Sequence, residues 1–217
     1  MKGSRILAVE TSTSLCSLCL WEEQRPIAYE EVSTSTSQAS VLFELLERIQ
    51  SQTNVDLRML SHVAVTRGPG SFTGLRVGLS FAKGISLSAS IPLLGLSCFE
   101  VAMHKVKTLG MTMGVVCFCL DTKREDFYTA FYEGDRCLEI GVFNTESLLE
   151  KARQLNVQFF FTDKYWSIEE GACFQNSLRL TAADVARAAQ DFLHYAPSLF
   201  SVDPLYLRPP KVYEGRQ

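Results

Sequence analysis

The sequence predicts an α/β protein of two similar lobes, each with a mixed β-sheet flanked by helices. Val9-Glu10-Thr11 ends one short apolar run and Leu120-Asp121-Thr122 ends a second, so each marks a strand that leads into an acidic turn. At the same offset, segment 16–21 falls on segment 127–132, and both have the composition of a returning strand. An internal repeat of this length indicates two lobes of one plan.

The first lobe is expected to span residues 1–107. Three short strands separated by tight polar turns form an antiparallel meander, at 5–9, 15–21 and 26–32. A helix follows with apolar residues at three- and four-residue spacing, then strand, helix, strand and helix. These segments are 38–50, 62–66, 72–89, 92–96 and a helix that Ser97 caps and that reaches about Lys107.

The second lobe is expected to span residues 108–217. Its meander continues with a strand at 136–143, followed by a helix at 145–155, a strand at 157–161 and a last helix at 181–194. This last helix is expected to pack back on the first lobe. No low-complexity linker separates the two halves, so the lobes should pack as one body.

The most distinctive stretch is Thr66-Arg67-Gly68-Pro69-Gly70-Ser71-Phe72-Thr73-Gly74-Leu75-Arg76-Val77-Gly78. The Gly-Pro-Gly segment turns the chain, and Ser71 or Thr73 can cap the helix that follows. A glycine turn before a helix can also hold phosphate. Here Pro69 removes one amide, and the Gly-Lys-Ser/Thr of a P-loop is missing, so this sequence is weak support for a phosphate site.

The helix at 72–89 has an unusually narrow polar stripe, formed by Arg76, Ser80 and Lys83. Gly74, Gly78 and Ala82 recur every four residues and form a flat strip that another backbone can approach closely. A helix that is apolar over most of its circumference should be covered on more than one side. Its own sheet covers one side, and the other is predicted to meet a second protein. The alternative is a helix buried wholly inside its own domain.

Composition excludes several classes of protein. Hydrophobic residues make up 47% and charged residues 21% of the 217 residues, as in ordinary globular proteins, and the net charge of −3 gives no surface that binds nucleic acid on its own. The first residues lack the pattern of a signal peptide, and seven cysteines without framework spacing indicate reduced thiols in a cytoplasm. Cys16 and Cys19 should face opposite sides of a strand.

The two-lobed plan resembles the actin-like ATPase superfamily, the ASKHA or duplicated ribonuclease-H-like fold. That resemblance implies that the acidic turn of each lobe holds phosphates and magnesium, and that a Gly-Gly loop holds adenosine. Here the second-lobe strand ends in Thr162-Asp163 rather than glycines, so a small-molecule kinase is the less favoured alternative. We expect neither a cofactor nor a metal. The degenerate phosphate turns comprise Glu10, Thr11, Ser12, Asp121 and Thr122.

A closer resemblance follows from motifs along the whole chain. Five segments are similar to motifs of the TsaB (YeaZ) family. They are 6–12 (Ile-Leu-Ala-Val-Glu-Thr-Ser), 67–78 as quoted above, 92–97 (Pro-Leu-Leu-Gly-Leu-Ser), 121–128 and 204–208. The resemblance implies a non-catalytic subunit of the machinery that forms N6-threonylcarbamoyladenosine next to the anticodon of ANN-decoding tRNAs. The implied partners are a TsaD homologue as heterodimer and the ATPase TsaE, with a homodimer when alone. tRNA is bound only through the complex, in the cytoplasm and away from membranes.

In this family the first two helices meet TsaD or a second copy. By position, the expected partner interface comprises Gln38, Val41, Leu42, Leu45, Phe72, Gly74, Leu75, Gly78, Leu79 and Ala82. The chain departs from the family by having Glu10 in place of aspartate and Gln38-Ala39-Ser40 in place of His-Ser-Glu. A metallopeptidase, the remaining alternative, needs closely spaced ligands, whereas His62, His104 and His194 lie far apart in the sequence.

Overall fold

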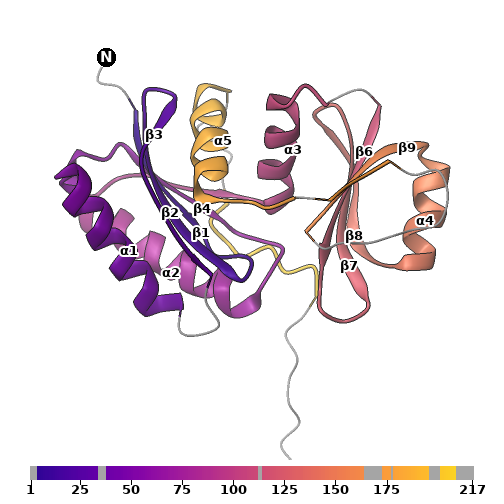
Figure 1. Ribbon diagram of the computed structural model, residues 1–217, viewed down its shortest axis with the longest axis horizontal. Helices are drawn as coiled ribbons and strands as arrows, with labels where there is room; N and C mark the ends of the chain where they lie inside the picture. The colour runs from indigo at the N-terminus through magenta and orange to yellow at the C-terminus, as the bar shows by residue number, and fades with distance from the viewer. Residues whose placement is uncertain are drawn as a thin grey trace, which may run out of the picture.

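The computed structural model describes residues 4–33, 38–111, 114–163, 173–176, 178–195 and 201–208 (Figure 1). The elements follow in order as β1 (Arg5–Glu10), β2 (Leu15–Glu22), β3 (Arg25–Ser33), α1 (Gln38–Thr53), the 3-10 helix η1 (Leu57–Met59), β4 (His62–Thr66), α2 (Phe72–Ala89), β5 (Leu93–Leu96), α3 (Cys98–Thr108), β6 (Val115–Asp121), β7 (Asp126–Glu133), β8 (Arg136–Asn144), α4 (Thr145–Gln154), β9 (Val157–Thr162), β10 (Cys173–Asn176) and α5 (Ala182–Tyr195).

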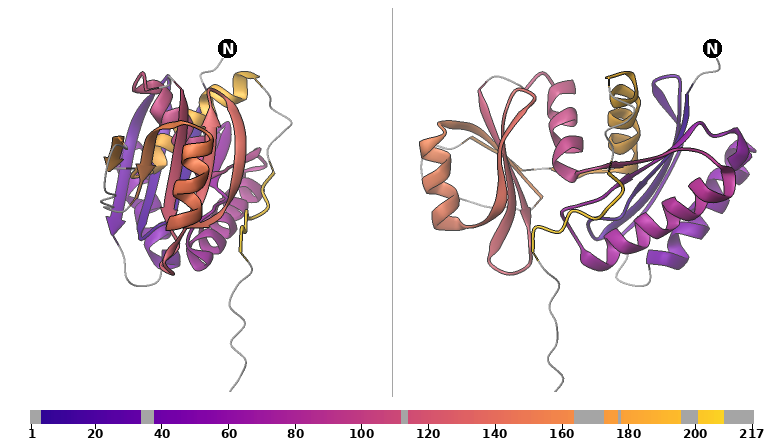
Figure 2. Two further views of the ribbon diagram at one scale, coloured as in Figure 1. Left: turned by 90° about the vertical axis from the view of Figure 1, so that its right-hand side faces the viewer. Right: turned by 180° about the vertical axis from the view of Figure 1, so that it is seen from behind.

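The elements stack in layers (Figures 1 and 2). Helices α1 and α2 cover the outer face of the first sheet, α3 and α5 lie between the two sheets, and α4 covers the outer face of the second sheet. Because both faces of β1 are covered, five of its six residues are buried and the strand is apolar almost throughout. The prediction of mixed sheets flanked by helices is confirmed.

The two sheets have the same topology. Their strand orders are β3-β2-β1-β4-β5 and β8-β7-β6-β9-β10, with the first three strands antiparallel and the others parallel. A register shift lies between Leu20 and Trp21 in β2, and another between Phe131 and Tyr132 in β7. The offset that places Glu10 on Asp121 also places these two irregularities on each other. The repeat seen in the sequence therefore extends to strand register.

One apolar core joins the two sheets through α3 and α5. It contains Trp21 from the first sheet, Phe118 from the second, and Phe99 and Val185 from the helices between them. The indole Nε1–H of Trp21 donates to the side-chain oxygen of Gln190 on α5, so the polar atom of the largest buried residue has a partner. Helix α5 packs on β1 and β2, although it follows the second sheet in the sequence.

Capping residues explain where α2 and α3 begin. The Ser71 hydroxyl accepts from the Gly74 amide at 3.2 Å, and Ser97 and Glu100 form a reciprocal capping box at the start of α3. The predicted elements agree with the structure to within a few residues, but β10 and η1 were not predicted. Cys16 and Cys19 lie in different apolar clusters on opposite faces of β2, as predicted. Among the described residues, no helix is long and apolar enough to cross a membrane.

The glycine strip of α2 faces the interior of the chain. A Cβ atom at Gly78 would overlap the Thr11 hydroxyl, whereas a Cβ atom at Gly84, on the exposed side of the same helix, would meet nothing within 4 Å. The two glycines therefore differ in packing while sharing the same helical conformation.

We predict that Gly78→Ala destabilises the protein and that Gly84→Ala stabilises it. Alanine favours a helix over glycine by about 0.5–1 kcal/mol at both positions, but crowding against Thr11 costs about 1–3 kcal/mol at Gly78 alone. Urea unfolding of both variants measures the difference. A Gly78→Ala protein as stable as Gly84→Ala would show that the contact with Thr11 is not tight.

Candidate functional site

The acidic turn of the first lobe is closed by the chain itself. The Ser71 amide donates to the Ser12 carbonyl at 2.7 Å, and the Thr11 hydroxyl donates to the Gly74 carbonyl at 2.8 Å. Gly70 lies so close to the Ser12 carbonyl that a Cβ atom there would overlap it. The start of α2 thus covers the first acidic turn, and Glu10, Thr11 and Ser12 are all buried.

Glu10 is 0% exposed. Its Oε1 atom accepts from the Ser12 amide at 2.6 Å and from the Ser12 hydroxyl, while Oε2 and the Thr66 hydroxyl have no hydrogen-bond partner among the described residues. Burial raises the pKa of Glu10, outweighing the bonds from Ser12 and the nearby Thr66 hydroxyl, which lower it. Burial therefore favours the protonated form of Glu10 more than it is favoured in an exposed glutamate.

The acidic turn of the second lobe is held by a carboxylate of the same chain. The Asp121 amide donates to Asp163 Oδ1 at 2.9 Å, and the Lys123 amide donates to Asp121 Oδ1 at 2.9 Å. The Asp163 carboxylate thus takes up one amide of this turn and adds a negative charge that would repel a phosphate. Neither turn fits a magnesium–phosphate group, and no cluster of three or more metal-ligating side chains occurs within the described ranges.

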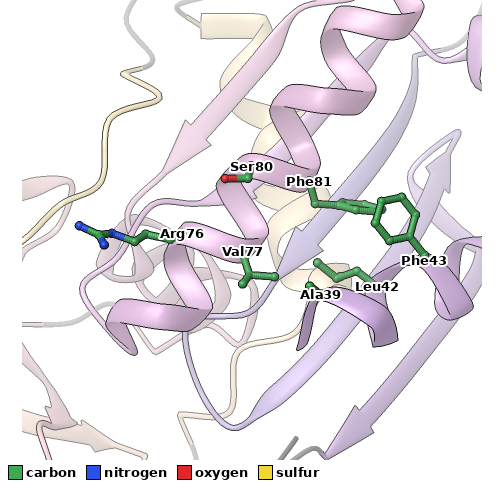
Figure 3. Close-up of a pocket in the computed structure, with 7 residues that line it drawn as sticks. All are labelled: Ala39, Leu42, Phe43, Arg76, Val77, Ser80 and Phe81. Atoms are coloured by element: carbon green, nitrogen blue, oxygen red, sulfur yellow. The ribbon is translucent and has the colours of Figure 1, made fainter. Parts of the chain in front are cut away.

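The outer surface of the first lobe carries an apolar groove between α1 and α2 (Figure 3). It has a volume of about 290 Å³ and is lined by Ala39, Leu42, Phe43, Arg76, Val77, Ser80 and Phe81. The rings of Phe43 and Phe81 meet edge to face with centroids 5.2 Å apart, and 59% of Phe43 remains exposed. An exposed aromatic side chain beside a groove marks a site where another surface can bind.

Charge is divided between the two helices that form the groove. α2 exposes Arg76 and Lys83 and has no acidic residue, whereas α1 exposes Glu44 and Glu47 together with Arg48, which pairs with Glu30 of β3. Leu87, near the end of α2, is 79% exposed and extends the apolar surface. Figure 3 shows the guanidinium of Arg76 pointing away from the apolar side chains. A shallow apolar strip with opposite charges on its two sides suits a protein surface better than a small polar ligand.

The interface predicted from sequence requires correction. Seven of its residues are buried inside this chain: two are glycines, and the other five are at most 4% exposed. They are Leu42, Leu45, Gly74, Leu75, Gly78, Leu79 and Ala82. Of these seven, only Leu42 lines the groove. Val41 and Phe72 are partly buried, and the side chain of Gln38 lies outside the described residues. The glycine strip packs on the first acidic turn, so the apolar seam is internal and the outer face belongs to other residues of the same helices.

Sequence reasoning missed Phe43, Val77 and Phe81 as residues that line the groove, of which Phe43 is exposed, Val77 is partly buried and Phe81 is 8% exposed. Each of these residues lies beside the main apolar stripe of its helix and makes the stripe wider. That extra width was the sequence signal that could have identified them. The periodicity shows how far apolar residues extend around a helix, but it does not show which of them the chain covers itself.

Comparison with known proteins places the chain in a family. A family model described as "TsaD: tRNA N6-adenosine threonylcarbamoyltransferase" matches residues 33–166, which is more than half of the chain. The chain belongs to this family. It groups there with the TsaB (YeaZ) proteins.

Individual relatives cover different shares of the chain. The tRNA threonylcarbamoyladenosine biosynthesis protein TsaB of Escherichia coli (strain K12) is 29% identical over 94% of both chains. A tRNA N6-adenosine threonylcarbamoyltransferase of Fervidobacterium nodosum is 33% identical over 42% of this chain and 32% of its own. The solved structure of YeaZ from Pseudomonas aeruginosa superposes with a TM-score of 0.75 at 21% identity, covering 94% of this chain and 100% of that one, and so supports the fold.

We predict that Glu10→Gln changes how stability depends on pH. Because burial raises the folded-state pKa of Glu10, the wild-type protein loses stability as pH rises above about 4.3, the ordinary value of a glutamate, by up to about 1.4 kcal/mol per pH unit until the folded pKa is reached. Glutamine is neutral throughout and can donate to Thr66, so the variant should lack this loss. Urea unfolding between pH 4 and pH 9 measures it.

Glu47→Gln, an exposed change on α1, serves as the matched control and should leave the pH profile unaltered. A constant difference between Glu10→Gln and wild type across the whole pH range would contradict a raised pKa at Glu10.

Proposed function

We propose that this protein is a non-catalytic subunit that binds and stabilises a TsaD homologue in the formation of N6-threonylcarbamoyladenosine in tRNA. The observation that carries the proposal is the groove between α1 and α2, where Phe43 stays 59% exposed beside Phe81. Helices α1 and α2, whose side chains line the groove, lie on the far side of the first sheet from α3 and α5 (Figure 1). A partner can therefore dock without disturbing the shared core.

The relatives supply the pathway. The Escherichia coli relative is named for tRNA threonylcarbamoyladenosine biosynthesis, and the family model is named for the transferase itself. We assign the accessory role to this chain because its two acidic turns do not fit nucleotide chemistry. Glu10 is not exposed to solvent, and Asp163 accepts the hydrogen bond of the Asp121 amide, which is then not available to a phosphate.

The remaining partners follow from the same face and from charge. A second copy of the chain would use the groove when TsaD is absent, because the basic side of one groove can face the acidic side of another. TsaE is proposed to join only the larger complex. A net charge of −3 favours tRNA binding through the complex rather than by this chain alone, and we place that complex in the cytoplasm.

We predict that the isolated protein neither hydrolyses ATP nor binds Mg-ATP measurably in a calorimetric titration. The first turn is sealed by the start of α2, and the second is occupied by Asp163. ATP turnover that is abolished by Asp121→Asn would instead favour the small-molecule kinase.

We predict that Phe43→Ser weakens binding of the TsaD homologue about 30- to 1000-fold, because a central aromatic anchor of an interface contributes about 2–4 kcal/mol. Calorimetric titration with purified TsaD homologue measures the affinity. A tRNA modification assay with all other components present should show a matching loss.

The matched control is Leu109→Ser, which removes a leucine that is 64% exposed at the end of α3, away from the groove. Both variants should unfold within a few degrees of wild type, as expected for surface substitutions. If Phe43→Ser and Leu109→Ser bind the TsaD homologue equally well, the groove is not the docking site.

A further inference from the structure

Residues 201–208 cross the molecule as an extended strap. The Leu205 amide donates to the Arg67 carbonyl at 2.7 Å, and a Cβ atom at Gly68 would lie 2.8 Å from the Leu205 carbonyl oxygen. Ser201 packs in the same way on Gly95 in β5. The strap runs from the first lobe, past the glycine turn, toward the second sheet, as Figure 2 shows in its right-hand view.

Tyr206 fastens the strap to the first turn of α2. Its ring lies on that of Phe72 with centroids 4.9 Å apart, and its hydroxyl accepts from Arg76 Nε at 3.1 Å. The Arg76 guanidinium also lies over the Phe72 ring, 3.8 Å from its centroid. These three side chains form one stack. Arg76 is also part of the groove lining, so the stack is continuous with one end of the groove.

Arg208 fastens the other end of the strap to the second lobe. Its guanidinium pairs with Asp126 at the start of β7, and the two side chains are only 28% and 17% exposed. Asp126 also accepts from the Thr122 hydroxyl, so the anchor is part of the second acidic turn. Burial acts to raise the pKa of Asp126, but the bonds from Arg208 and Thr122 lower it overall. The pair is therefore ionised at neutral pH.

We propose that the strap is a positioning element that ties the first turn of α2 to the second lobe and so holds the Arg76 end of the groove in place for a partner. The shared core joins the two sheets through α3 and α5, but α2 contributes none of the buried residues of that core in the described ranges. The strap therefore connects the first turn of α2 to the second lobe. Its part in docking rests on the proposed function, whereas its part in ordering α2 does not.

The test is hydrogen exchange of the amides in residues 68–76, measured by mass spectrometry on Arg208→Ala, Asp126→Asn and the double variant. Loss of the anchor should raise exchange there about 5- to 30-fold, the effect of losing one partly buried charged pair. The double variant should exchange no faster than either single variant, because both side chains act through one ion pair. Asparagine keeps an acceptor for Thr122, so the acidic turn itself is preserved.

Arg58→Ala is the matched control. It removes an arginine–aspartate pair of the same kind that is exposed and confined to η1, so exchange at 68–76 should stay at the wild-type rate. Wild-type exchange in both Arg208→Ala and Asp126→Asn would overturn the proposal.

Binding to the TsaD homologue, measured on the same variants, separates the two proposals. Arg208→Ala should weaken binding by a factor no larger than its effect on exchange. Faster exchange with wild-type affinity would overturn the role of the strap in docking. Faster exchange together with a wild-type protein that does not bind the TsaD homologue would support the strap as an ordering element and refute the proposed function.

Discussion

The contact on which this structure depends is the close approach of the glycine turn to the first acidic turn. The Ser71 amide bonds to the Ser12 carbonyl at 2.7 Å, and Gly70 leaves the room that this approach needs. Because the same contact starts α2, it fixes the rotation of that helix. The strip containing Gly74 and Gly78 then faces Thr11, while Arg76 and Ser80 face outward. Burial of the acidic turn and exposure of the groove are two consequences of one contact.

The sheets of the two lobes have the same topology, but the helices that cover their outer faces differ. α4 packs on the outer face of the second sheet through a compact cluster that includes Leu148, Ala152 and Phe131. The outer face of the first sheet carries α1 and α2 side by side, and between them a groove of about 290 Å³ remains on the surface. The duplicated architecture thus gives equivalent sheets, and within the described residues the paired helices leave a surface groove on the first lobe.

Much of the fold could be predicted from the sequence, because its strands and helices are short, periodic and clearly capped. Ser97 with Glu100 is a capping box that is readable at three-residue spacing, and the offset between Glu10 and Asp121 revealed the duplication. The direction of the glycine strip was predicted wrongly, since a flat strip suits the chain's own turn as well as a partner. The strap was missed because backbone bonds, the stack of Tyr206 on Phe72 and the Arg208–Asp126 ion pair hold it, and none of these leaves a periodic pattern.

Burial of Glu10 changes what this fold can do. A carboxylate that binds a hydrated cation must face water, whereas Glu10 is 0% exposed and its pKa is raised by burial. Glu10 instead accepts from the amide and the hydroxyl of Ser12 and supports the turn from inside. In this chain Gly70 and Gly78 let the start of α2 close over the first acidic turn.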